Sequence, residues 1–492
     1  MVHFERATPH FIEKVQDIIE LLKPKLHTVS DGDLKINGFE VDSRKIKPGQ
    51  VFIAIPGARV DGHSFVVRAL EKGASACLIS RKINGEIPPG CIWVQDTVIA
   101  LDYLAAAHRR SLNVKLIAIT GSVGKTTTKE LLYNLLAPHF YTKKSEGNFN
   151  STIGLPMQIL RLERSDEVMI AEMGMSYPGE IRTLMRIASP DIALWTSVKR
   201  AHLANFDSIE DIARAKAEMV EELGQDKTLI YNADDPLVTK HAMTFGGRKV
   251  SYGFMSPVAD VCGQISAFAD WEGTNFKVDY SDGQEGNYFL SAPGKYNIYN
   301  ALACCSVAWF LSLKQMDFSA SFKRGVSIAG RSQLQIYDGD VFLVDDSYNA
   351  SPFALAQVIR CFCGLSEKNY RWIVVGDMLE QGRHEVGIHR VLGHELANAD
   401  FDRVTFVGDL VRHSYDTFRQ FSDGNAQVEH FGDVQAARQI TDAPIPEHSR
   451  IWIKGSRAIG LEHIAQAFTA RLENRDESFD TSPFSLHGGT DS

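Results

Sequence analysis

The chain has 492 residues, of which 44% are hydrophobic and 23% charged, and its formal net charge is -9. One hydrophobic core does not grow to this size, and a prior of about 150 residues per domain predicts roughly three domains. This ordinary globular composition without a basic excess argues against nucleic acid as a partner.

The sequence predicts neither a membrane span nor secretion. The longest apolar stretch, residues 301–313, is too short to cross a bilayer and predicts a buried helix instead. The N-terminus has no apolar signal core, and the seven cysteines are scattered without zinc-ligand spacing. A cytoplasmic protein with reduced thiols is the simplest interpretation, and we expect a monomer.

The first two thirds of the chain contain two regions of α/β pattern. Short apolar runs alternate with turns over residues 1–112, as in residues 51–55 before Pro56-Gly57, which predicts a small α/β domain. Over residues 113–329 strands alternate with helical stretches, which predicts a parallel, doubly wound sheet. The predicted strands of this region are residues 116–120, 168–173, 192–197 and 228–232.

A second doubly wound unit is predicted for residues 330–475. Its predicted strands are residues 341–345, 372–376, 404–408 and 451–454, separated by amphipathic helices. The tail, residues 476–492, has little to bury and is expected to be disordered. The fold class predicted for the chain is therefore α/β with three domains.

A glycine-rich turn separates an apolar strand from a helix in the segment LIAITGSVGKTTTKELL, residues 116–132. Gly121 and Gly124 allow a tight turn, the amides at the helix N-terminus face an anion, and Lys125 can reach terminal phosphates. The strict P-loop pattern has a glycine where this chain has Ile119, so the match is to a shortened variant. An ordinary strand-to-helix turn is the alternative. The predicted phosphate-binding residues are Thr120, Gly121, Ser122, Val123, Gly124, Lys125, Thr126 and Thr127.

A magnesium site is predicted beside this loop. The Thr126 hydroxyl is placed to bind Mg²⁺, and Glu172 ends a neighbouring strand where carboxylates face the ligand crevice. One or two carboxylates together with substrate phosphates are sufficient for Mg²⁺. The alternative is that Glu172 is a solvated residue at a strand end.

Lys216 falls on the apolar stripe of a helix expected over residues 209–223. Because burying an ammonium is costly, a lysine there requires a lowered pKa, a carboxylate partner or a modification. A neutral buried amine can react with carbon dioxide to form a carbamate, which offers oxygen ligands. The pattern alone also allows a snorkelling lysine at the edge of the stripe.

Other candidate residues have ordinary alternatives. His202 lies on a loop after the strand 192–197, where a histidine is usually only solvated. Asp345 and Asp346 end a strand and could orient an attacking amine or a cation, although a helix cap is the commoner role. Arg331 is suited to clamp a phosphate or carboxylate, or to form a structural salt bridge.

Several segments in the same order resemble the Mur ligase family, over nearly the whole chain. These segments are residues 41–65, 120–130 (TGSVGKTTTKE), 147–156 (GNFNSTIGLP), 171–175 (AEMGM), 345–352 (DDSYNASP), 374–382 (VVGDMLEQG) and 453–462 (IKGSRAIGLE). The last three are similar to the branch of the family that adds D-alanyl-D-alanine.

The resemblance implies an ATP-dependent amide ligase built of three domains. The N-terminal domain would bind the UDP-substrate, the central P-loop domain ATP, and the C-terminal Rossmann-like domain the incoming dipeptide. The carboxylate of UDP-N-acetylmuramoyl-tripeptide would attack the γ-phosphate of ATP to give an acyl phosphate. The amine of D-alanyl-D-alanine would then attack that carbonyl, and ADP and phosphate would leave.

The resemblance also implies roles for individual residues. Lys125 would stabilise the transferring phosphoryl group, and Thr126 with Glu172 would bind a first Mg²⁺. A carbamylated Lys216, with Glu172 and His202, would hold a second Mg²⁺ between the acyl carboxylate and the γ-phosphate. Further positions implied are Asn300 near the adenine, Asp346 and Arg331 near the phosphates, and Ser43 and Arg44 near the uridine diphosphate.

The chain departs from the family pattern at three places. Tyr296 stands where the GxHN motif often has histidine, Ser151 replaces the second Asn of an NN pair, and residues 196–202 read TSVKRAH instead of TNxGxAH. These departures concern the adenine contacts and the loop before His202.

Three other functions remain as alternatives. The first is a related ligase with a different amine substrate, either another Mur-type or a folylpolyglutamate-type enzyme. The second is a non-catalytic nucleotide-binding scaffold, which the retained phosphate and metal residues oppose. The third is a P-loop GTPase, although no convincing Asn-Lys-x-Asp segment is present.

Overall fold

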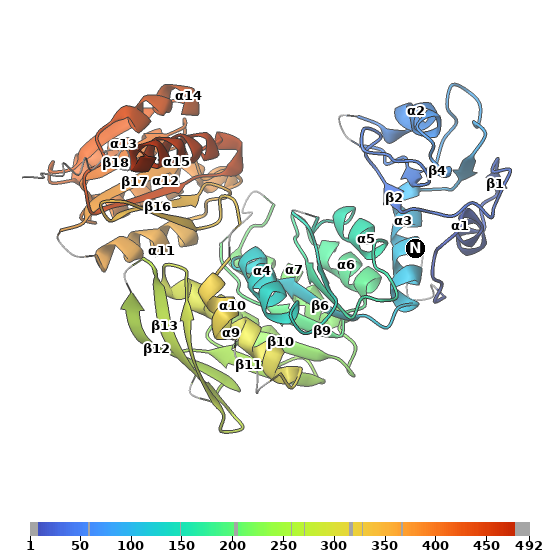
Figure 1. The fold of residues 1–492 in the computed structure, drawn as a ribbon, viewed down its shortest axis with the longest axis horizontal. Helices are drawn as coiled ribbons and strands as arrows, with labels where there is room; N and C mark the ends of the chain where they lie inside the picture. The colour runs from blue at the N-terminus through green and yellow to red at the C-terminus, as the bar shows by residue number, and fades with distance from the viewer. Residues whose placement is uncertain are drawn as a thin grey trace, which may run out of the picture.

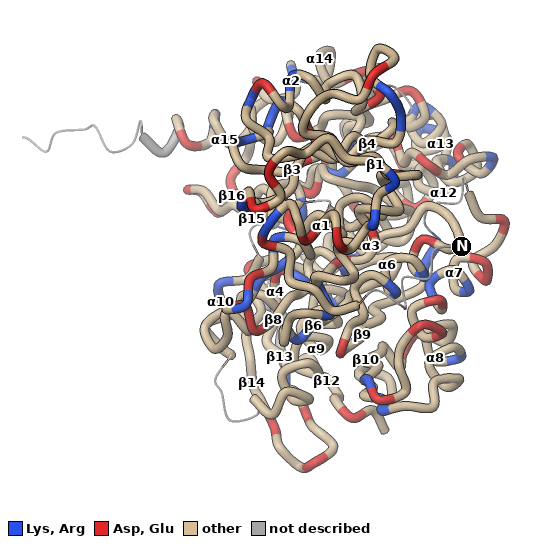
Figure 2. Tube along the Cα trace, turned by 90° about the vertical axis from the view of Figure 1, so that its right-hand side faces the viewer, with Lys and Arg blue, Asp and Glu red and all other residues tan. Residues whose placement is uncertain are grey.

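Three β-sheets with helices packed against them form the protein, which confirms the α/β fold class (Figure 1). The computed structural model describes residues 8–57, 60–147, 149–200, 205–256, 258–269, 271–313, 318–326, 328–365 and 368–477. The sheets lie in three lobes, with the central lobe between the other two. Basic and acidic residues are interspersed over all three lobes (Figure 2).

The N-terminal lobe contains a five-stranded sheet in the order β1-β5-β4-β3-β2. Strands β2 to β5 are parallel, and β1 pairs with β5 antiparallel. The strands are β1 (Leu26–His27), β2 (Phe39–Glu40), β3 (Val51–Ile53), β4 (Ala76–Ile79) and β5 (Cys91–Trp93). The helices are α1 (Val15–Leu22), α2 (Val66–Glu71) and α3 (Thr97–Arg110).

The central lobe contains a nine-stranded sheet in the order β14-β13-β12-β11-β10-β9-β6-β8-β7. Its strands are β6 (Lys115–Thr120), β7 (Thr142–Lys144), β8 (Val168–Glu172), β9 (Ile192–Trp195), β10 (Thr228–Asn232), β11 (Arg248–Gly253), β12 (Val261–Ala269), β13 (Gly273–Tyr280) and β14 (Glu285–Leu290). The pairs from β7 to β12 are parallel, as predicted. Antiparallel strands β13 and β14 extend this sheet, and they were not predicted from the sequence.

Helices cover both faces of the central sheet. They are α4 (Lys125–Leu136), α5 (Gly154–Ile159), α6 (Glu180–Ala188), α7 (Ile209–Glu222), α8 (Pro236–Ala242), α9 (Lys295–Phe310) and α10 (Ser319–Arg324). Successive residues of β6 point to opposite faces, so that Leu116 and Ala118 join one apolar core while Ile117 and Ile119 join another. Burial on both faces explains why parallel strands read as continuous apolar runs. The apolar stretch after residue 300 lies in the buried helix α9, as predicted.

The C-terminal lobe contains a six-stranded sheet in the order β15-β16-β20-β17-β18-β19. The strands are β15 (Gln333–Tyr337), β16 (Val341–Asp346), β17 (Tyr370–Gly376), β18 (Arg403–Val407), β19 (Gln427–Phe431) and β20 (Ser449–Lys454). All are parallel except β15. The helices are α11 (Pro352–Cys363), α12 (Glu385–Ala397), α13 (Arg412–Phe421), α14 (Val434–Ala437) and α15 (Glu462–Glu477). The predicted tail overlaps the end of α15, and residues 478–492 lie outside the described residues.

The lobes are joined by two different kinds of packing. Helix α3 of the N-terminal lobe packs on α5 and α6 of the central lobe, and one apolar core runs through both lobes. Trp271, in the turn between β12 and β13, instead inserts into the core of the C-terminal lobe. Its ring centroid lies 4.8 Å from that of Phe362 and 5.1 Å from that of Trp452. Among the described residues, no helix is long and apolar enough to cross a membrane.

Asp102 on α3 is a buried acid, and it makes stability depend on pH. The side chain is 4% exposed, and Oδ1 has no hydrogen-bond partner among the described residues. Burial and the charge of Asp96 raise the pKa of Asp102 to about 8. Because the folded state then binds more protons than the unfolded state above pH ~4, stability falls as pH rises to about 8.

We expect Asp102→Asn to raise the melting temperature relative to the wild-type protein by an amount that grows from pH 5 to pH 8 and then levels off. Each unit of pKa shift corresponds to about 1.4 kcal/mol, so the gain at high pH is large enough for thermal unfolding followed by circular dichroism. The exposed Asp226→Asn is the matched control and should show no such trend. A difference in melting temperature between wild type and Asp102→Asn that stays constant from pH 5 to pH 8 would contradict this account.

Candidate functional site

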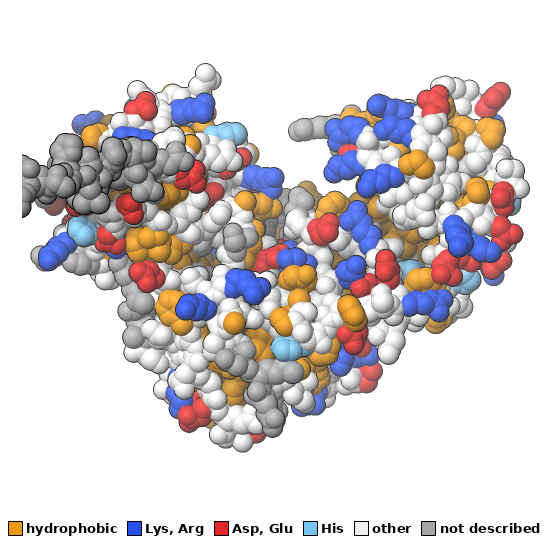
Figure 3. All heavy atoms as spheres, in the orientation of Figure 1, with side chains coloured by type: hydrophobic (Ala, Val, Ile, Leu, Met, Phe, Trp, Pro, Cys, Tyr) orange, Lys and Arg blue, Asp and Glu red, His pale blue; other side chains and the backbone are white. Residues whose placement is uncertain are grey.

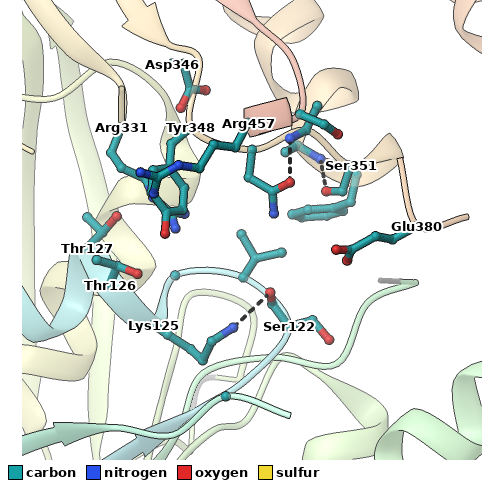
Figure 4. Close-up of a pocket in the computed structure, with 18 of the residues that line it drawn as sticks. Ser122, Lys125, Thr126, Thr127, Arg331, Asp346, Tyr348, Ser351, Glu380 and Arg457 are labelled. Atoms are coloured by element: carbon teal, nitrogen blue, oxygen red, sulfur yellow. Dashed lines mark hydrogen bonds between the residues drawn. The ribbon is translucent and has the colours of Figure 1, made fainter. Parts of the chain in front are cut away.

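A cleft of about 930 Å³ lies between the central and C-terminal lobes (Figure 4). The central lobe contributes the loop before α4, the end of β8, and side chains of α7 and α9. The C-terminal lobe contributes the segments that follow β16, β17 and β20. Ligands of open α/β sheets bind at the carboxyl ends of strands, so both sheets present their ligand-binding edges to this cleft.

The loop from β6 to α4 has the geometry of an anion site. Gly121 and Gly124 both have positive φ, at 151° and 89°. A Cβ atom at Gly121 would lie 2.0 Å from Thr196 Oγ1, and one at Gly124 would lie 2.4 Å from Asn300 Oδ1. Thr128 N makes the first helical hydrogen bond of α4, to Gly124 O at 2.8 Å, which leaves the preceding amides for a ligand.

Residues after β9 hold this loop in place. Ser122 N donates to Ser197 O at 2.8 Å, and Val123 N donates to Ser197 Oγ at 3.2 Å. The Thr196 hydroxyl donates to Val123 O at 2.7 Å. Thr196 and Ser197 therefore brace the phosphate loop, a role that was not predicted because only folding brings the two segments together. His202, predicted as a metal ligand, lies outside the described residues.

Lys125 lies at the mouth of the loop and lines the cleft with Thr126 and Thr127 (Figure 4). Its ammonium donates to Gly121 O at 2.7 Å, so it has no carboxylate partner in hydrogen-bond range among the described residues. Burial lowers the pKa of Lys125, the Glu172 carboxylate opposes this shift, and the Arg331 guanidinium adds to it. An anion would be drawn to this uncompensated charge.

Glu172 ends β8 with a side chain that is 3% exposed. Asn150 Nδ2 donates to Oε1 at 3.0 Å, whereas the buried Oε2 has no hydrogen-bond partner among the described residues. The nearest ammonium is that of Lys129, 3.8 Å from Oε2. Because an unsatisfied carboxylate oxygen is costly to bury, this position fits a divalent cation.

Lys129 was not predicted as part of the site. It is 1% exposed and donates to Ser145 O at 2.8 Å. The sequence did contain one indication that Lys129 belongs to the site, because it lies four residues after Lys125 and therefore on the same face of α4. Within the described ranges no three His, Cys, Asp or Glu side chains gather as a metal site.

Lys216 on α7 is buried and lines the cleft. Its side chain is 2% exposed, and no hydrogen bond or ion pair joins it to another residue that the structure describes. Burial, with a contribution from Lys125, lowers the pKa of Lys216 well below its usual value. The snorkelling alternative is therefore wrong, and a neutral or modified amine fits the position.

Asn300 and Tyr296, both on α9, line the inner wall of the cleft. Asn300 Oδ1 accepts a hydrogen bond from Thr128 Oγ1 at 3.2 Å, so this side chain also supports the start of α4. The hydroxyl of Tyr296 lies 3.2 Å from Ser332 Oγ, and burial raises its pKa well above the usual value. Tyr296 therefore links the central lobe to the start of the C-terminal sheet.

On the opposite wall, two arginines stack on one tyrosine (Figure 4). The guanidinium carbon of Arg331 lies 4.0 Å from the ring centroid of Tyr348, and that of Arg457 lies 4.9 Å from it. Neither arginine forms an ion pair with a carboxylate in the described part of the chain. Such a cluster of free positive charges indicates that anions bind in the cleft.

Asp346 is already paired within the C-terminal lobe. Lys454 Nζ donates to Asp346 Oδ2 at 2.6 Å, and Ser332 N donates to Oδ1 at 3.1 Å. Both charged side chains are buried, at 7% and 4% exposure, and both line the cleft. Asp345, which precedes Asp346, accepts a hydrogen bond from Ser347 N at 3.0 Å, and burial raises the pKa of Asp345. Neither Lys454 nor Arg457 was predicted from the sequence as a site residue.

Ser43 and Arg44 lie in the N-terminal lobe and do not line this cleft. The Arg44 side chain is 80% exposed and pairs with Asp42, and Lys72 Nζ donates to the carbonyls of Ser43 and Arg44 at 2.9 and 3.0 Å. Basic side chains gather on the N-terminal lobe where it faces the gap between the outer lobes (Figure 3). This surface suits a second anionic group, separate from the phosphate loop.

Family models match three consecutive parts of the chain. They are described as Mur ligase family, catalytic domain (residues 35–119), Mur ligase middle domain (residues 119–308), and Mur ligase, glutamate ligase domain (residues 330–457).

Named relatives match over most of their length. The chain is 32% identical to the UDP-N-acetylmuramoyl-tripeptide–D-alanyl-D-alanine ligase of Bacillus subtilis, with 92% of this chain and 97% of the relative covered. It is 30% identical to the protein of the same name from Escherichia coli, with 88% and 94% covered.

Two solved structures have a similar fold. One is MurF from Acinetobacter baumannii, with a TM-score of 0.83, 25% identity, and 93% of this chain and 99% of that chain covered. The other is the MurF ligase of Thermotoga maritima in complex with ADP, with a TM-score of 0.77, 27% identity, and 89% and 98% covered.

Proposed function

The chain belongs to the Mur ligase family, and from this we infer that it is an ATP-dependent ligase that joins D-alanyl-D-alanine to UDP-N-acetylmuramoyl-tripeptide in peptidoglycan precursor synthesis. The observation that carries this inference is the alignment with a ligase of that name, which is 32% identical and covers 97% of the relative's length. The cleft fits the reaction, because it joins a phosphate loop to the ligand-binding edge of a second sheet.

The reaction proceeds through an acyl phosphate in this proposal. The α4 amides and the Lys125 ammonium hold the β- and γ-phosphates of ATP, and Arg331 balances their charge from the facing wall. The tripeptide carboxylate attacks the γ-phosphate, ADP leaves, and the dipeptide amine then displaces phosphate from the acyl carbon. Closure of the C-terminal lobe over ATP would be needed to keep water from the acyl phosphate.

Four side chains would hold magnesium: Thr126, Glu172, His202 and a carbamylated Lys216. The unpartnered Glu172 Oε2 and the buried, unpaired Lys216 support this set. Mg²⁺ would neutralise charge on the carboxylate and phosphate oxygens. Asn150 donates to Glu172 Oε1 and fixes the orientation of this carboxylate.

The remaining assignments are also proposals. Asn300 lies near the adenine, Asp346 orients the attacking amine or the phosphates, and Ser43 and Arg44 bind the uridine diphosphate. The three family-model matches support domains at residues 1–112, 113–329 and 330–475, each close to one matched segment. We place the enzyme in the cytoplasm, where its nucleotide substrates are made, and propose that it acts as a monomer.

Phosphate release from ATP and Mg²⁺ in the presence of UDP-N-acetylmuramoyl-tripeptide tests this function. We expect release to depend on D-alanyl-D-alanine and to be at least about 100-fold slower with D-alanine, L-alanine or L-glutamate, because the second site is built for a dipeptide. Mass spectrometry of the product should show the pentapeptide. Release with a single amino acid would assign the chain to another ligase step, and no release with any amine would favour a non-catalytic scaffold.

A further inference from the structure

Arg457 has no assigned role, although it lines the cleft at the carboxyl edge of the C-terminal sheet. It begins the 3-10 turn η5 (Arg457–Ile459), which follows the end of β20. Strand β20 lies between β16 and β17 in the sheet, and the segments after all three strands line the cleft. A side chain on this turn therefore faces whatever binds at the carboxyl edge of the sheet.

The charge of Arg457 is available to a ligand. Its guanidinium stacks on the Tyr348 ring, and within the described residues no carboxylate pairs with it. Stacking on an aromatic face leaves the N–H edge of a guanidinium free to bind a planar anion with two hydrogen bonds. The other cation on this part of the wall, Lys454, is already committed to Asp346 and to Asn349 O.

The two stacked arginines come from different segments of the chain, Arg331 from just before β15 and Arg457 from just after β20. Arg331 lies close enough to Lys125 to lower the pKa of that ammonium, so Arg331 belongs with the phosphates of ATP. Arg457 belongs to the strand-end loops of the C-terminal sheet, together with the small or apolar side chains of Ala354, Ala458 and Phe353. An anionic group flanked by small apolar groups is the chemistry of a short alanine peptide that ends in a carboxylate.

We propose that Arg457 binds the C-terminal carboxylate of the incoming dipeptide and makes the enzyme specific for an acceptor with a free carboxylate. This inference rests on the proposed function. Amide formation consumes the amine end of the dipeptide, so the other end keeps its charge throughout the reaction. A carboxylate brought into the cleft requires a cation, and Arg457 supplies one at the edge where the dipeptide binds.

The test compares D-alanyl-D-alanine with D-alanyl-D-alaninamide, in which a neutral amide replaces the carboxylate. For the wild-type enzyme, we expect kcat/KM for the carboxylate form to be higher by about 10- to 100-fold, the range for hydrogen bonds between charged groups. Arg457→Ala and the longer Arg457→Gln should both reduce this preference to within about threefold of unity. KM for ATP should change by less than about twofold, because Arg331 and Lys125 remain.

Two controls make the result decisive. Arg412→Ala removes an exposed arginine of the same lobe that pairs with Asp416, and it should keep the wild-type preference. Arg457→Lys keeps a charge without the planar fork and should retain part of the preference. Because Arg457 is exposed, its variants should unfold at the wild-type temperature.

A full preference for the carboxylate form in Arg457→Ala or Arg457→Gln would overturn the proposal. A raised KM for ATP with the preference intact would also overturn it, and would assign Arg457 to the phosphates. Equal use of the carboxylate and amide forms by the wild-type enzyme would overturn it as well. If wild-type enzyme shows no dipeptide-dependent phosphate release, the proposed function fails before any variant is compared.

Discussion

Lys125→Ala is expected to slow dipeptide-dependent phosphate release by at least about 1,000-fold, because charge clamps on a transferring phosphoryl group contribute effects of that size. Among the residues that the structure describes, the Lys125 ammonium bonds only to loop carbonyls, at 2.7 Å from Gly121 O and 3.4 Å from Ser122 O. It can exchange these neutral acceptors for phosphate oxygens without breaking an ion pair. Initial rates of phosphate release at saturating substrates measure the effect.

The same variant should still bind nucleotide. The helix amides and the braced loop remain, so the affinity for a non-hydrolysable ATP analogue, measured by calorimetry, should fall far less than the rate. Lys115→Ala, at the exposed start of β6, is the matched control and should retain wild-type activity. A Lys125→Ala enzyme within tenfold of the wild-type rate would remove this lysine from the phosphate site.

Lys216→Ala is the second variant expected to abolish ligation. If the buried amine carries a carbamate, its loss removes an anionic ligand from the cleft. Added bicarbonate should not restore activity, since the amine that reacts with carbon dioxide is gone. Formate, acetate or propionate should restore part of it, because a short carboxylate can enter the space left by the side chain.

Arg214→Ala is the matched control for this experiment. Arg214 lies on the same helix with a side chain that is 71% exposed, and it pairs with Asp211. Its loss should leave the rate unchanged with or without added carboxylate. Full activity of Lys216→Ala would contradict the carbamate hypothesis, and equal stimulation of wild type and variant by acetate would show that the rescue is not specific.

The sequence was sufficient to predict the elements that follow from local pattern. The strands at residues 116–120 and 228–232 are buried on both faces, so their apolar runs identified them, and the glycine spacing identified the phosphate loop. Lys216 was predicted to be unusual because it is a charged residue on the apolar stripe of a helix. Its burial in the structure decides between the two interpretations that the pattern allowed.

Contacts between distant segments could not be predicted in this way. Thr196 and Ser197 hold the phosphate loop through hydrogen bonds that exist only once β9 lies beside β6. The stacking of Arg331 and Arg457 on Tyr348 joins residues from three separate segments, each of which looks ordinary alone. The strands β13 and β14 were missed because their pairing depends on extending a sheet formed elsewhere in the chain.

The place of Trp271 limits how the cleft can open. Its indole is 2% exposed and donates from Nε1 to Cys361 O at 3.3 Å, so a side chain of the central lobe is enclosed by the apolar core of its neighbour. Pulling the lobes apart would expose this ring to water, whereas turning them about it would not. We therefore expect the two lobes to move relative to each other by rotation about Trp271 and not by separation.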